Sequence, residues 1–163
     1  MKRRHLVLVP AIAVAILSAC ASQAPHVPVS VADTIARDPQ LSTLNGLVQQ
    51  AGLADTLKGS GPYTVFAPTN EAFKEVPAKT MDALSHDPAM LKAVLSYHVL
   101  PAKLMAADVT NSKAKTAQGA NLELAKSGGI VTVEDAMVQT PDIVATNGVV
   151  HTVDRVLMPP KAH

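Results

Sequence analysis

The chain has 163 residues, with 14 basic and 13 acidic side chains, one cysteine and no tryptophan. Its formal charge of +1 argues against nucleic acid as a partner, because phosphate binding needs a concentrated excess of Lys and Arg. A single cysteine excludes a disulfide within one chain, and a chain of this size can bury about two-thirds of its unfolded surface in one core.

The beginning of the chain has the features of a secretory signal peptide. Three basic residues at positions 2–4 precede an apolar run over residues 6–17, which is too short to span a bilayer comfortably. The sequence Leu17-Ser-Ala-Cys20 resembles the lipobox of bacterial lipoproteins, and this resemblance implies cleavage before Cys20 and lipidation of its sulfur. The alternative is ordinary cleavage after Ala21, which would give a soluble secreted or periplasmic protein.

Cleavage before the cysteine would leave a slightly acidic mature chain, with a formal charge of about −2. Ala21 would then follow the lipidated residue, and by analogy with Gram-negative sorting it is compatible with transfer to the outer membrane. The segment over 20–28 contains two prolines and reads as a tether that reaches roughly 30 Å. The sequence thus predicts a lipoprotein-type signal peptide over 1–19, a lipidated cysteine and tether over 20–28, one domain over 29–160 and a short tail over 161–163.

The first half of the predicted domain is patterned for short helices. Apolar residues recur at helical spacing after several residues that are suited to cap a helix. Gly52 is expected to end one of these helices, and a short β-prone run over 63–66 is expected to end at Pro68. The last of the helices carries His98 on its apolar face. The expected capping residues are Ser30, Asp38, Thr69 and Asp87.

The second half is patterned for strands, which together with the helices predicts an α+β fold. Short apolar runs alternate with turn residues at 122–124, 130–133, 136–138 and 143–144.

A hairpin closes this half. Asn147-Gly148 between two β-branched runs predicts a tight turn with both residues at positive φ. With that two-residue loop, Ala145 would face Val150 and Val144 would face His151.

Three sequence blocks resemble fasciclin (FAS1) domains in their order and spacing. The resemblance implies a wedge-shaped β-sandwich flanked by several short helices, and a role in adhesion or protein–protein interaction. Ala102 and Glu134-Asp135 depart from the common pattern, in both cases in a turn. The blocks are Tyr63-Thr-Val-Phe-Ala-Pro-Thr-Asn-Glu-Ala-Phe73, Leu95-Ser-Tyr-His-Val-Leu-Pro101 and Asn147-Gly-Val-Val-His-Thr-Val-Asp-Arg-Val-Leu-Met-Pro159.

The same resemblance implies two candidate partner-binding segments, because integrin recognition in animal fasciclin domains is attributed to a Tyr-His pair and to a Pro-Asp-Ile-like segment. The matching residues are Tyr97 with His98, and Asp142 with Ile143. The alternative for each is structural, with His98 as a hydrogen-bonded core residue and Ile143 as a sheet residue. The residues expected to form caps, turns and buried hydrogen bonds are Thr69, Asn70, Asn147, Gly148, His151 and Asp154.

Catalysis and metal binding have little support in the sequence. No Gly-x-Ser-x-Gly elbow occurs, and the only cysteine belongs to the predicted anchor. The histidines after the signal peptide include no pair at i, i+4 spacing, although His98, His151 and Asp154 could converge in space. We therefore expect no enzymatic activity, no cofactor and no metal.

The favoured function is that of a lipid-anchored fasciclin-domain protein, exposed at the cell surface or in the periplasm. Its partner would be an unknown protein of the envelope or the extracellular matrix, with Cys20 holding it to the membrane. The second hypothesis is a soluble envelope protein that binds a small apolar ligand between helices and sheet. A hydrolytic enzyme is the third and least favoured hypothesis.

Overall fold

The structure is a computed structural model, and it describes residues 29–160. The predicted signal peptide, the tether with Cys20 and the tail lie outside these residues. No helix in the described range has the length and apolar character needed to cross a membrane. The helices are α1 (Val31–Arg37), 3-10 helix η1 (Pro39–Leu41), α2 (Ser42–Gln50), α3 (Ala54–Leu57), α4 (Asn70–Glu75), α5 (Ala78–His86) and α6 (Pro88–Tyr97). The strands are β1 (Tyr63–Pro68), β2 (Val99–Leu100), β3 (Ser112–Lys115), β4 (Asn121–Ser127), β5 (Ile130–Val133), β6 (Ala136–Ala145) and β7 (Gly148–Val153).

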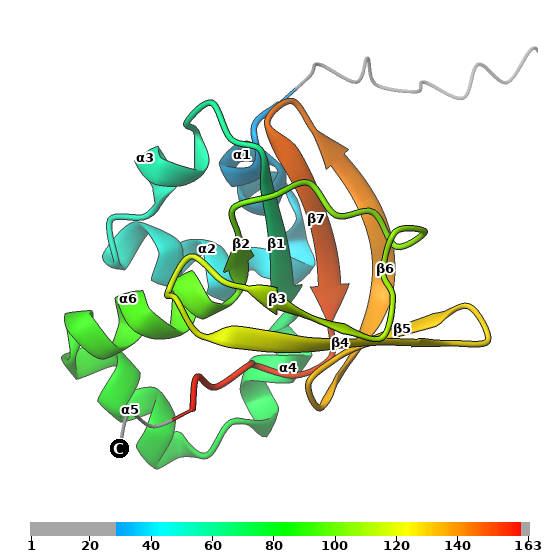
Figure 1. Cartoon of the computed structure of the whole chain (residues 1–163). Helices are drawn as coiled ribbons and strands as arrows, with labels where there is room; N and C mark the ends of the chain where they lie inside the picture. Colours follow the sequence, from blue (N-terminus) through cyan, green and yellow to red (C-terminus); the bar gives the residue numbers. More distant parts are fainter. Residues whose placement is uncertain (1–28, 161–163) are drawn as a thin grey trace, which may run out of the picture.

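One seven-stranded sheet in the order β2-β1-β7-β6-β5-β4-β3 organises the molecule. Only β1 and β7 pair in parallel, and the other neighbours are antiparallel. Strand β6 pairs with β5 at its beginning and with β7 along its length, and two register shifts between Val138 and Ile143 interrupt the β7 pairing. As a result β3 and β4 cross in front of β1 and β7 (Figure 1). The backbone N–H of Ala117 then donates to the Val99 carbonyl at 2.7 Å, which nearly closes the sheet.

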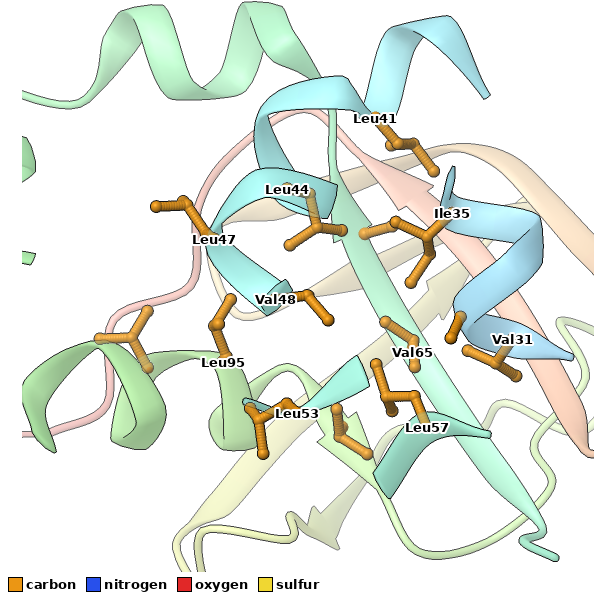
Figure 2. Packing of buried hydrophobic residues seen from close by; sticks show 14 of the residues in the cluster. Val31, Ile35, Leu41, Leu44, Leu47, Val48, Leu53, Leu57, Val65 and Leu95 are labelled. Carbon is orange, nitrogen blue, oxygen red and sulfur yellow. The ribbon is translucent and has the colours of Figure 1, made fainter. Parts of the chain in front are cut away.

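Two apolar clusters form the core of this sandwich. One lies between the helices and the outer face of the β1–β7 pair, where side chains from α1, α2, α3 and α6 meet Val65 (Figure 2). The other lies inside the folded sheet and contains Phe66 together with residues of β4 and β5. Since Val65 and Phe66 face opposite clusters, β1 is buried on both faces, as a parallel pair usually is. The α+β class expected from the sequence, with a folded sheet flanked by several short helices, is thus confirmed.

The predicted helix starts are confirmed as well. Side chains at the four expected positions accept backbone N–H bonds at the beginning of α1, η1, α4 and α6. Gly52, at φ 68°, follows the end of α2. The helices α3 and α5 and the strands β2 and β3 were not predicted from the sequence. Strand β3 lacked a signal because Lys113 and Lys115 leave it without an apolar alternation.

The closing hairpin is displaced by one residue from the predicted one. Ala145 pairs with Gly148, and Val144 pairs with Val149, so Thr146 and Asn147 form the turn. Neither Asn147 nor Gly148 has a positive φ, and the prediction that Val144 faces His151 is wrong. The cause is tertiary: a Cβ on Gly148 would collide with the carbonyl group of Tyr63 in β1. Glycine is needed here because the absence of a side chain lets β7 approach β1 closely, and not because the turn requires a positive φ.

Candidate partner-binding site

Tyr97, at the end of α6, is buried against the inner cluster of the sheet. Its hydroxyl group lies 3.1 Å from Oε1 of Glu134 and 3.2 Å from the carbonyl oxygen of Asn121. Burial, reinforced by the Glu134 carboxylate, raises the pKa of Tyr97 to about 12, because both disfavour the phenolate. The hydroxyl is therefore a neutral donor that ties α6 to the β4–β5 hairpin.

His98 is also buried, and both of its ring nitrogens have backbone partners. Nδ1 lies 2.8 Å from the Val94 carbonyl oxygen, and Nε2 accepts the backbone N–H of Leu157 at 2.9 Å. These two bonds assign the neutral tautomer with the proton on Nδ1. Burial lowers the pKa of His98 to about 4, against the smaller opposing effect of the Val94 bond. In this structure neither Tyr97 nor His98 presents a side chain to a partner.

Asp142 lies at the irregularity in β6, with a φ of 58°. Its Oδ1 accepts the backbone N–H of Ala106 at 2.7 Å, and its own N–H donates to Nδ1 of His151 at 3.0 Å. The other ring nitrogen of His151 lies 2.7 Å from the Leu104 carbonyl, to which it donates. Burial lowers the pKa of His151 and outweighs the Asp142 carboxylate, which lies 3.9 Å from Nδ1. The neutral His151 ring and Asp142 thus form a hydrogen-bonded clamp, and the ring is stacked on Phe66 with 5.5 Å between the ring centroids.

This clamp holds the loop formed by residues 101–111, which passes over β6 and β7 (Figure 1). Two further side chains that the sequence analysis did not identify secure the same loop. The hydroxyl of Thr64 donates to the Ala102 carbonyl and accepts the Leu104 N–H, and Nζ of Lys126 donates to the carbonyls of Ala106 and Ala107. Such contacts join segments far apart in the chain, and no local sequence pattern indicates them.

The exposed apolar residue in this region is Val144, the neighbour of Ile143, and not Ile143 itself. Ile143 pairs with Val150 and packs partly against the helical cluster, whereas the Val144 side chain is 63% exposed. The Asp142 side chain is 35% exposed, and Pro141 is exposed. Strand pairing between β6 and β5 is confined to the first two residues of β6. Among residues 29–160, the later part of β6 is therefore an edge without a second strand partner, and it carries an exposed apolar residue and a carboxylate.

Asn147 connects the hairpin to the helical layer. Its Nδ2 donates to the carbonyls of Leu57 and Gly59, both at 2.7 Å, and its Oδ1 accepts the Val31 N–H at 2.8 Å. Its own carbonyl accepts the N–H of Tyr63 at 3.0 Å. One residue thus joins β7 to α1, to the end of α3 and to β1.

The remaining framework residues make bonds of the same kind. Thr69 accepts the Ala72 N–H at 3.4 Å as the N-cap of α4. The side chain of Asn70 accepts the Thr43 N–H and donates to the Pro39 carbonyl, each at 3.0 Å, so it links α4 to α2. Oδ1 of Asp154 accepts the N–H of Met137 at 2.7 Å.

His98, His151 and Asp154 do not act together: each is bonded to a different backbone segment. Between residues 29 and 160, no group of three His, Cys, Asp or Glu side chains is placed to hold a metal ion.

The sandwich is FAS1-like, as the sequence predicted. The sequence model of the fasciclin domain matches residues 39–159, and the chain belongs to the fasciclin domain family. A solved FAS1 domain pair from the insect cell adhesion molecule fasciclin I superposes with a TM-score of 0.66 at 17% identity. That match covers 80% of this chain and 51% of the other, and it shows a shared fold.

Several relatives support the same assignment. Protein sll1483 of Synechocystis is 38% identical over 133 residues, which cover 80% of this chain and 74% of that protein. The cell surface glycolipoprotein MPB83 of Mycobacterium bovis is 37% identical over 135 residues, covering 80% of this chain and 60% of that protein. The transforming growth factor-beta-induced protein ig-h3 of Sus scrofa is 41% identical over 132 residues, which cover 80% of this chain but only 19% of ig-h3. The family is thus found in adhesion and cell-surface proteins.

Proposed function

We propose that this protein is a lipid-anchored fasciclin-domain protein that binds a protein partner at the cell surface or in the periplasm. The observation that carries the proposal is the single cysteine, Cys20, at the exit of a signal-like segment and a short tether ahead of a fasciclin domain. The relative named a cell surface glycolipoprotein supports this reading.

The anchor is tested by blocking its processing. In cells treated with globomycin, which inhibits lipoprotein signal peptidase, we expect an unprocessed precursor to accumulate. Cys20→Ser should move the protein from the membrane fraction to a soluble or unprocessed form, while Ser22→Ala serves as the matched control and stays at the membrane. Processing that is indifferent to globomycin would exclude the lipid anchor and favour cleavage after Ala21.

The contact surface in this proposal is the edge of β6 around Asp142 and Val144. Its support is an edge that has no second strand partner within residues 29–160, the exposed Val144 side chain, and the positive φ of Asp142 that the loop clamp holds. Tyr97 and His98 contribute indirectly, because their bonds hold α6 against the sheet and the C-terminal segment.

Crosslinking on intact cells followed by pull-down tests this surface. We expect Val144→Asp to lose the crosslinked partner, because it places a charge in an apolar contact. Ile130→Asp is the matched control, since Ile130 is 52% exposed on the neighbouring strand β5 and should keep the partner. A partner that is retained by Val144→Asp and lost by Ile130→Asp would place the contact on the β4–β5 hairpin instead.

A further inference from the structure

A groove runs between α5, α6 and the segment that ends the described chain. Its volume is about 610 Å³, within the range of roughly 300–1,000 Å³ that is usual for small-molecule sites. It lies at the opposite end of the molecule from the beginning of α1 (Figure 1), so binding there is independent of the anchor proposed above. The groove is lined by Lys79, Thr80, Ala83, Met90, Ala93, Val94, Gln118, Met158, Pro159 and Pro160.

The walls of this groove are apolar and adaptable. Met90 and Met158 are 39% and 41% exposed, although most large apolar side chains of the domain are buried. Methionine is flexible and polarizable, so two exposed methionines in the lining can fit the shape of a chain-like ligand. Ala83 and Ala93 keep the space between the two helices open, and Val94 forms a buried floor.

Among the described residues, one cation lies at this apolar groove. Within residues 29–160, Lys79 is the one charged residue that lines it, and no carboxylate of this range forms a salt bridge with this lysine. An apolar channel with a single ammonium group is complementary to an apolar chain that ends in a single negative charge. We propose that the groove binds a single-chain amphipathic carboxylate of the fatty-acid class, with its alkyl chain against Met90 and Met158 and its carboxylate at Lys79.

Displacement of a fluorescent fatty acid tests this site. The full mature chain, residues 20–163 without lipid, is titrated with 11-(dansylamino)undecanoic acid, and palmitate and hexadecanol are added as competitors. We expect saturable binding that palmitate displaces. Ala83→Phe, which fills the groove from an exposed helix position, should weaken binding at least tenfold. Lys79→Gln should weaken palmitate about fivefold, the size of an exposed ion pair, and leave hexadecanol unchanged.

Two exposed positions outside the groove supply matched controls. Ala89→Phe and Lys92→Gln, both on α6, should bind the probe as the wild type does, and thermal melting should show that all four variants are folded. The proposal fails if the probe does not saturate, if Ala83→Phe binds like the wild type, or if Lys79→Gln affects palmitate and hexadecanol equally. Displacement of the probe by an acidic amphipathic peptide but not by palmitate would also overturn it, and would make the groove a protein-docking site.

Discussion

The buried polar side chains between residues 29 and 160 all have hydrogen-bond partners. Several of these partners are backbone groups of distant segments, as with His98 and His151, and the half-buried Asp142 and Asn147 make bonds of the same kind. Removing one such side chain leaves a buried partner without a bond, which costs about 1–3 kcal/mol for each group. These residues therefore specify how the loops and helices sit on the sheet, in a way that apolar packing alone does not.

His98 should make the domain sensitive to acid. Its pKa is about 4 in the folded state and 6.5 ordinarily, so between these values the unfolded chain binds more protons than the folded one. The free energy of unfolding should therefore fall as the pH decreases from about 6.5 to about 4, by an amount on the order of 3 kcal/mol. Urea unfolding at pH 7.5 and 4.5 measures this loss.

A variant assigns the loss to His98. His98→Gln lacks the titrating ring, so the difference in stability between the two pH values should shrink although the variant is less stable overall. Part of the pH dependence should persist, because burial also lowers the pKa of His151. Equal losses in the wild type and in His98→Gln would contradict the assignment.

The parallel pair of β1 and β7 lies between the two apolar clusters, with Val65 facing one and Phe66 the other. The pair runs from Tyr63 opposite Gly148 to Pro68 opposite Val153, and the absence of a side chain at Gly148 allows the close approach at its beginning. A register slip of one residue would exchange the side chains that face the two clusters. Gly148 thus fixes a contact on which both clusters depend.

We expect Gly148→Ala to destabilise the domain by at least about 3 kcal/mol or to prevent folding, because its Cβ would overlap with rigid backbone of Tyr63. Gly46→Ala in α2 is the matched control. A Cβ at Gly46 meets no atom within 4 Å, so alanine should stabilise the helix by about 0.5–1 kcal/mol. Denaturant unfolding of both variants measures the difference. A Gly148→Ala protein as stable as the wild type would show that β7 can shift relative to β1.

The helix starts could be predicted from the sequence, whereas the position of the closing hairpin could not. Helix starts at Ser30, Thr69 and Asp87 could be predicted because a cap and its N–H donors lie within one turn of the chain. The hairpin position could not, because the contact of Gly148 with β1 overrides the local preference of Asn-Gly for positive φ.

The same distinction applies to the candidate site. The Asp142–Ile143 segment was identified by resemblance, but its geometry depends on bonds to the 101–111 loop and to His151. Val144, the most exposed of the large apolar side chains in the described range, was expected on the face of His151. The structure pairs it with Val149 instead of His151; because this is a shift of two residues along β7, Val144 stays on the same sheet face as His151, and the sequence did not indicate that it would be exposed there.

The folded domain includes a helix that precedes the residues matched by the family model. The family match begins at residue 39, whereas α1 lies before it and is packed into the helical cluster. Val31 and Ile35 of α1 are almost fully buried, and the backbone N–H of Val31 donates a hydrogen bond to Oδ1 of Asn147. Helix α1 therefore covers the sheet and completes the bonds of the hairpin, which is why we place the domain boundary at residue 29.

Truncation tests this boundary. A chain over 39–160 should be less stable than one over 29–160 by at least about 3 kcal/mol, since burying Val31 and Ile35 contributes roughly 1.5–3 kcal/mol each and the bond to Asn147 is lost as well. A chain over 20–160 is the control and should match the 29–160 chain, because the added residues are those of the predicted tether. Urea unfolding and thermal melting of the three chains measure the difference. Equal stability of the 39–160 and 29–160 chains would show that α1 is not part of the folding unit. The bonds of Asn147 to the end of α3 and to β1 would then be sufficient to hold this residue in place.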